Sequence, residues 1–154
     1  MEVIMLNGPS NRGKTTTIRI VHNLVISHGG VSLTAVSTNG DFTDEVNFAL
    51  QINCSRRLYF NSAGDTVKCI CAGIHYALNN GFDKIICACN DSFYNGNGVQ
   101  SVRLANYLNS IANSITLIRV PKRIQIPWNR NPLNPGMSQI VANLLDSNDI
   151  FALI

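Results

Sequence analysis

Short, continuous runs of apolar residues alternate along this chain with longer segments in which apolar residues recur every three or four positions. The continuous runs predict buried strands, and they cover residues 3–6, 31–36, 84–89 and 115–120. The periodic segments predict helices, and they cover residues 15–28, 67–79, 99–111 and 137–145. Because strands alternate with helices, the pattern predicts an α/β fold in which helices cover a mostly parallel central sheet.

One stretch departs from this alternation. Between Val46 and Ile52 single polar or small residues separate the apolar ones, and a second apolar run follows at residues 57–60. This spacing predicts a β-hairpin, which adds an antiparallel edge to the sheet.

Two segments lack any regular spacing. Residues 37–45 are polar and predict an exposed loop. Residues 121–136 carry four of the five prolines and predict a long irregular connection. Neither segment divides the chain, so we expect a single domain over residues 1–154.

Composition narrows the class of protein. Apolar residues make up 45% of the chain and charged residues 14%, which favours a globular domain over a disordered segment. The net charge of +3 helps an anionic ligand to approach but does not by itself indicate nucleic acid. The odd count of five cysteines argues against a disulfide framework. With no signal peptide and no membrane-spanning run, we expect a cytoplasmic protein without a membrane partner.

The loop after the first predicted strand carries the pattern G-x-x-x-x-G-K-T. Its eight residues are Gly8, Pro9, Ser10, Asn11, Arg12, Gly13, Lys14 and Thr15. Glycines without a Cβ atom let the backbone wrap closely around a phosphate, and successive amide groups then point at the anion. The N-terminus of the next helix adds a partial positive charge. A buried strand before this loop and an amphipathic helix after it are the context that a phosphate-binding loop requires.

Three side chains at the end of this motif have expected roles in a nucleoside-triphosphate site. We expect Lys14 to bridge the β- and γ-phosphates, Thr15 to ligate Mg²⁺ and Thr16 to contact the α-phosphate. With this motif the chain resembles the P-loop NTPase superfamily. The resemblance implies a three-layer P-loop fold and nucleotide binding with Mg²⁺, without implying a substrate.

A hydrolase or a kinase also needs a carboxylate near the Mg²⁺ ion, and two segments compete for this role. The first, residues 58–65, resembles the D-T-A-G segment of Ras-like GTPases, with Asn61 where those proteins have Asp. The resemblance implies that Asn61 reaches the metal through water. It also implies that the amide of Gly64 meets the γ-phosphate and that Asp65 orients the attacking water.

The second segment is the apolar strand that ends in Asn90 and Asp91. Asp91 looks like the acid of a Walker B strand displaced by one residue. Both acids also have a purely structural interpretation, in which Asp65 caps the next helix and Asp91 belongs to a turn.

The Ras-like layout extends to two further segments. It implies a switch loop at residues 37–45, where Thr38 or Thr43 senses the γ-phosphate. The segment that would read guanine, residues 118–123, lacks the N-K-x-D motif, so we expect ATP rather than GTP. The layout is also similar to small bacterial P-loop proteins of unassigned function.

Residues 119–130 gather basic side chains and Trp128 among prolines. The segment is open to three interpretations: a platform on which nucleic acid stacks, a lid over the nucleotide, or a solvated loop.

Three functions follow from these features. The first is an ATP-binding NTPase whose slow, Mg²⁺-dependent hydrolysis switches its conformation. The second is a small-molecule or nucleotide kinase, although no acidic acceptor motif follows the second strand. The third is a nucleotide-sensing module without catalysis that works through a protein partner, which the basic segment favours.

Overall fold

The computed structural model describes residues 1–154 with the exception of residues 39, 52–53, 95, 97 and 124–136. In chain order the elements are β1 (Glu2–Gly8), α1 (Lys14–Ser27), β2 (Val31–Ser32), β3 (Val36–Thr38), β4 (Asp41–Gln51), β5 (Cys54–Asn61), α2 (Val67–Asn79), β6 (Lys84–Asn90), α3 (Asp91–Tyr94), α4 (Val99–Ser110), β7 (Thr116–Pro121) and α5 (Gln139–Phe151). The predicted α/β class is therefore confirmed.

Seven strands form one sheet in the order β2-β4-β5-β6-β1-β7, and β3 also pairs with β4. Strands β5, β6, β1 and β7 run parallel to one another, whereas β2, β3 and β5 are each antiparallel to β4. The predicted hairpin is confirmed as β4 and β5. The sheet as a whole is mixed, so the prediction of a mostly parallel sheet is wrong. After α1 the chain first forms the antiparallel half of the sheet, with β2, β3 and β4, and then continues into the parallel half with β5.

The prediction of an exposed loop at residues 37–45 is also wrong, because the paired strands β3 and β4 occupy most of this segment. From Phe42 to Phe48 every second side chain is buried, which is the period of a strand with one face inward. One inward side chain is Asp44, whose carboxylate lies 2.7 Å from Nε2 of His22 and accepts from the amide of Thr34 at 3.0 Å. These bonds offset the cost of burying the carboxylate. In the sequence, however, a charged residue at an inward position obscures the alternation of apolar and polar residues that is typical of a strand.

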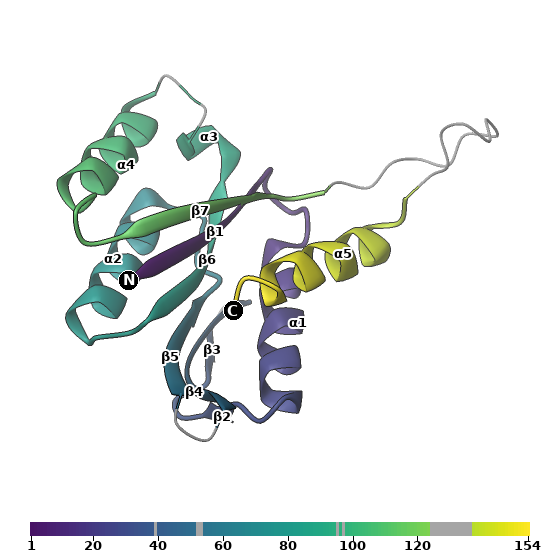
Figure 1. The fold of residues 1–154 in the computed structure, drawn as a ribbon. Coiled ribbons are helices and arrows are strands. Elements are labelled where there is room, and N and C mark those ends of the chain that lie inside the picture. Colours follow the sequence, from purple (N-terminus) through teal and green to yellow (C-terminus); the bar gives the residue numbers. More distant parts are fainter. Residues whose placement is uncertain (39, 52–53, 95, 97, 124–136) are drawn as a thin grey trace.

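Helices cover both faces of the sheet, which gives three layers (Figure 1). Helices α1 and α5 lie on one face, where the buried side chains include Leu6, Ile18, Val21, Ile86 and Ile150. Helices α2 and α4 lie on the other face, where they include Met5, Ile70, Ile74, Ile85 and Leu104. The loops that follow the parallel strands β5, β6, β1 and β7 leave the sheet at the same edge, at the carboxyl ends of these strands.

The last helix covers Gln139–Phe151 rather than residues 137–145. Its second half looks polar in sequence, but Asp146 and Ser147 are fully buried and turn inward. The predicted strand at residues 31–36 is divided into β2 and β3, and the chain directly after β6 forms the short helix α3. Among the described residues, no helix combines the length and the apolar character needed to cross a membrane.

Candidate functional site

Strand β1 ends at the carboxyl edge of the parallel half of the sheet, and the loop between β1 and α1 begins there. A Cβ atom on Gly8 would lie 2.5 Å from Cβ of Lys122. At Gly13 the φ angle is +79°, and a Cβ atom there would lie 2.6 Å from Oδ1 of Asn143. Glycine is therefore required at both fixed positions of the motif, for close approach at the first and for conformation and space at the second.

The loop leaves the N-terminus of α1 open. Gly13 is the N-cap residue and makes no side-chain capping bond, and the first turn of α1 carries no acidic residue. By contrast, the hydroxyl groups of Thr66 and Ser138 cap α2 and α5. In the described part of the chain no side-chain cap closes the N-terminus of α1, and the helix dipole makes this a favourable place for an anion.

Lys14 is the first residue of α1, and its side chain turns back across the loop. Its Nζ donates to the carbonyl oxygens of Gly8 at 2.9 Å and Pro9 at 2.7 Å. Burial lowers the pKa of Lys14 below its ordinary value of 10.5, and the charges of Asp65 and Asp91 partly oppose this shift. The ammonium group is therefore held beside the loop and within the influence of both predicted acids.

A cavity of about 370 Å³ opens in front of the loop. One wall is built by residues of the motif, namely Asn11, Arg12, Gly13, Lys14 and Thr15. The facing wall is built by Ser62 and Asp65 from the turn after β5. The structure thus brings Asp65 together with Lys14 and Thr15. Asp65 is not the cap of α2, because the hydroxyl of Thr66 accepts the amide of Cys69 at 3.1 Å.

Other predicted residues lie near the cavity without lining it. Pro9, Ser10 and Thr16 belong to the same loop and first helical turn, but they are absent from the cavity wall. The Oγ of Ser10 accepts from Nδ2 of Asn90 at 2.5 Å, which ties the loop to the end of β6.

Asn61 and Gly64 are engaged within their own turn. The Oδ1 of Asn61 accepts from the amide of Ala63 at 2.9 Å, and this residue is 4% exposed. The amide of Gly64 donates to the carbonyl of Ser62 at 2.8 Å. The structure therefore does not present Asn61 to a metal in the cavity, nor the Gly64 amide to a phosphate.

Asp41 is a carboxylate that the sequence analysis missed. It begins β4 beside the cavity wall, because the next residue, Phe42, exchanges two hydrogen bonds with Ser62: the amide of Phe42 donates to Oγ at 2.7 Å, and its carbonyl accepts from the Ser62 amide at 2.8 Å. Burial and then the charge of Asp65 raise the pKa of Asp41 above its ordinary value. The charge of Asp65 thus acts on Asp41 from the cavity wall.

Asp91 lies outside this cavity, as the first residue of α3. It lines a neighbouring cleft at the ends of β1, β6 and β7, although its charge still acts on Lys14. Its predicted turn role is met instead by Asn90, whose Oδ1 accepts from the amide of Ser92 at 3.1 Å.

Helix α5 supports the loop from behind. The side chain of Gln139 donates to the carbonyl of Arg12 at 3.1 Å and to Oδ1 of Asn143 at 3.0 Å. Asn143 occupies the space against Gly13. No local pattern connects these residues with the loop, since they meet it only through the packing of α5 on α1.

The start of the predicted basic segment is neither a lid nor a solvated loop. The Nζ of Lys122 lies 2.5 Å from Oδ2 of Asp146, and both side chains are fully buried. Arg123 lies 2.7 Å from Asp146 and 2.7 Å from Asp149 of the same helix. These pairs fix the chain after β7 to α5. Trp128 and Arg130, on which the stacking interpretation depended, fall outside the described residues.

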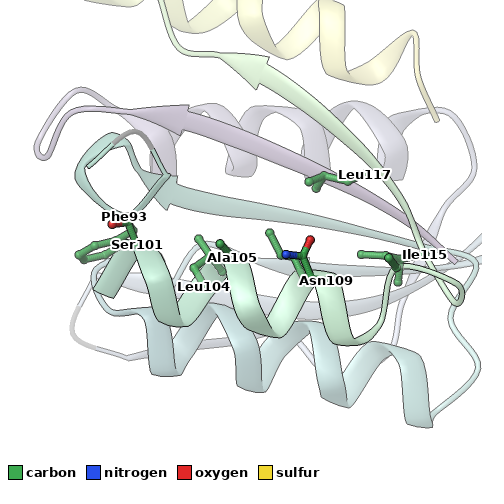
Figure 2. Close-up of a pocket in the computed structure, with 9 residues that line it drawn as sticks. Phe93, Ser101, Leu104, Ala105, Asn109, Ile115 and Leu117 are labelled. Carbon is green, nitrogen blue, oxygen red and sulfur yellow. The ribbon is translucent and has the colours of Figure 1, made fainter. Parts of the chain in front are cut away.

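A second cavity, of about 280 Å³, lies between α4 and β7, away from the loop. Figure 2 shows side chains of α4, among them Leu104 and Ala105, along the space below Leu117. Among the described residues of its wall, Ser101 and Asn109 are the polar ones and none is charged. This cavity therefore does not suit a phosphate.

Within the described part of the chain, no group of three or more His, Cys, Asp or Glu side chains could hold a metal ion. Comparison of the chain with protein-family models, with curated proteins and with solved structures finds no match. The function is therefore inferred from the chemistry of the cavity itself.

Proposed function

We propose that this protein binds ATP at the cavity in front of the β1–α1 loop and hydrolyses it slowly. The observation that carries the proposal is the meeting of Lys14, Thr15 and Asp65 in one cavity at an uncapped helix N-terminus. An ammonium group and open amide groups suit phosphates. A hydroxyl and a carboxylate opposite them suit the metal that accompanies a triphosphate.

Mg²⁺ fits the donors of the cavity. It is usually bound through one or two carboxylates together with substrate phosphates and water, and such a site needs no complete cage of protein side chains. Thr15 and Asp65 line the cavity, and the charge of Asp65 acts on Asp41. When bound, Mg²⁺ would neutralise phosphate charge. These two carboxylates, rather than Asn61, are the groups we propose for it.

The turn that contains Ser62 and Asp65 is the element we propose to respond to the nucleotide. It faces the loop across the cavity and is bonded to β4 through Phe42. Slow turnover is expected, since among the described residues Asp65 is the one carboxylate in the cavity wall and no histidine lines it. Strands β3 and β4 are not proposed as a switch loop.

Replacing Lys14 with alanine tests the proposal. We expect the affinity for ATP with Mg²⁺ to fall about 10- to 100-fold, because a hydrogen bond to a charged group contributes about 1.5–3 kcal/mol. Titration calorimetry with ATP and GTP measures the affinity, and phosphate release is followed in the same samples. Lys68→Ala is the matched control, since Lys68 lies exposed on α2. Failure of the unaltered protein to bind either nucleotide would rule the proposal out.

The lowered pKa of Lys14 predicts how affinity depends on pH. Because burial is the main cause of the shift, the ammonium of the free protein loses its proton at a lower pH than an exposed lysine. The affinity for ATP is expected to be complete near neutral pH and to decline before the pH reaches 10.5, the ordinary value. Calorimetric titrations between neutral pH and that value measure the decline. An affinity that stays constant over this range would show that the Lys14 charge is not used.

A further inference from the structure

A second polar cleft, of about 370 Å³, lies at the same edge of the sheet as the ATP cavity. Its wall consists of Asn7, Asp91, Arg119, Pro121 and Lys122, from the ends of β1, β6 and β7 and the residues that follow them. None of these residues lines the cavity in front of the loop. The cleft is thus a separate space that the proposed ATP site does not use.

The strand register places this cleft on the α2 and α4 side of the sheet. Asn7 pairs with Cys89 and Pro121, and Met5 pairs with Arg119. Residues paired across parallel strands, and residues two apart along a strand, share a face. Met5 and Cys89 belong to the core beneath α2 and α4, so Asn7 and Arg119 share that side. Helix α1 covers the opposite side.

Asn7 is the feature of the cleft that calls for a ligand. The residue is 4% exposed, and neither the nitrogen nor the oxygen of its side-chain amide has a hydrogen-bond partner in the described structure. A buried amide without partners is costly and uncommon. Its position in the wall of an open cleft explains it, because a bound molecule can supply both a donor and an acceptor there.

The cleft also carries one charge of each sign. Asp91 and Arg119 both line its wall, so the two charges face the same small volume. Burial raises the pKa of the Cys89 thiol to about 11, the charges of Lys14 and Arg119 partly oppose this shift, and that of Asp91 adds to it. The ammonium of Lys122 does not add to them, because it pairs with Asp146 on the other side of the sheet.

We propose that this cleft binds a small zwitterion of the amino-acid type. The carboxylate of the ligand pairs with Arg119, its ammonium group pairs with Asp91, and the amide of Asn7 bonds with both ends. Arginine suits a carboxylate through its planar fork of donors. Binding here does not require ATP, but the two sites are neighbours: Asp91 acts on Lys14, and Asn90 is bonded to Ser10 of the loop.

The test follows the Asn7 side-chain amide by nitrogen–proton NMR on the full chain. L-Alanine, L-serine and L-aspartate are titrated as zwitterionic probes, with glycolate and ethanolamine as probes that lack the ammonium or the carboxylate. At least one amino acid is expected to shift the Asn7 signal and to bind at least tenfold more tightly than either truncated probe. Absence of any shift, or equal binding of glycolate, would overturn the proposal.

Two variants separate binding from folding. Asn7→Leu removes the unpartnered amide at similar volume, so the protein is expected to fold with unchanged or greater stability and to lose amino-acid binding at least tenfold. Arg119→Gln is expected to lose it equally, whereas Arg103→Gln, at an exposed position of α4, retains it. Retained binding in Asn7→Leu would contradict the proposal.

An ATP titration of the same samples keeps the two proposals distinguishable. Amino-acid binding without ATP binding would reject the ATP site alone. ATP binding without amino-acid binding would reject the zwitterion cleft alone.

Discussion

Replacing Asp146 with alanine is expected to lower the free energy of unfolding by about 3–5 kcal/mol, the cost of removing one partner from a buried ion pair. The Asp146 carboxylate lies 2.5 Å from the Lys122 ammonium and 2.7 Å from Arg123, and the side chains of Lys122 and Asp146 are fully buried. The substitution leaves the Lys122 charge buried without its partner. Urea denaturation followed by circular dichroism measures the loss.

The chain provides two controls for this prediction. Asp149→Ala removes another carboxylate that lies 2.7 Å from Arg123, but its side chain is 53% exposed, so we expect a loss below about 1 kcal/mol. In the double variant Lys122→Met with Asp146→Leu no charge is left unpaired, and most of the stability is expected to return. Similar losses for the two single variants would contradict the account of a buried pair that fixes α5 to the chain after β7.

The substitution Gly64→Ala is expected to lower the free energy of unfolding by about 2–3 kcal/mol through overpacking. A Cβ atom on Gly64 would lie 2.6 Å from both the carbonyl carbon and the oxygen of Ala88. Ala88 belongs to β6 between two other strands, so its backbone cannot move aside as a flexible side chain would. Thermal unfolding measures the change, and a domain of this size should lose about 2–4 °C in Tm for each kcal/mol.

The matched control is Gly98→Ala at the N-cap of α4. A Cβ atom there meets nothing within 4 Å, so the expected loss is about 1 kcal/mol or less, from the poorer cap alone. Equal losses at Gly64 and Gly98 would mean that the turn bearing Ser62 and Asp65 tolerates displacement from β6. The prediction bears on the site, because this turn forms the wall that faces Lys14.

Elements whose signals are local were predicted closely from the sequence. Helix α2 begins and ends as expected at Val67–Asn79, because Thr66 caps its start and its apolar residues keep helical spacing. Three of the four continuous apolar runs became β1, β6 and β7. In β1 and β6 all residues but one are buried, which leaves few positions for polar side chains.

The errors fall where a polar side chain is buried by a distant partner. Asp44 made β4 look like a loop, although His22 of α1 lies 2.7 Å away from it. Asp146 and Ser147 made the second half of α5 look solvated, although both are fully buried. The wrong prediction of a mostly parallel sheet follows from the first of these errors, because the first half of β4 and its pairing with β2 and β3 were absent from the expected fold.

The sequence by itself determined the β1–α1 loop, since glycines at Gly8 and Gly13 and the residues between them act within one short segment. Only the tertiary structure decided what faces that loop. It placed Asp65 and Ser62 in the cavity wall, bonded Phe42, the residue after Asp41, to Ser62, and put Asp91 in a separate cleft with Asn7. The physical reason is that these residues come from different strands and turns, so which of them meet depends on the order of the strands in the sheet. That order arises when both faces of the sheet are buried together.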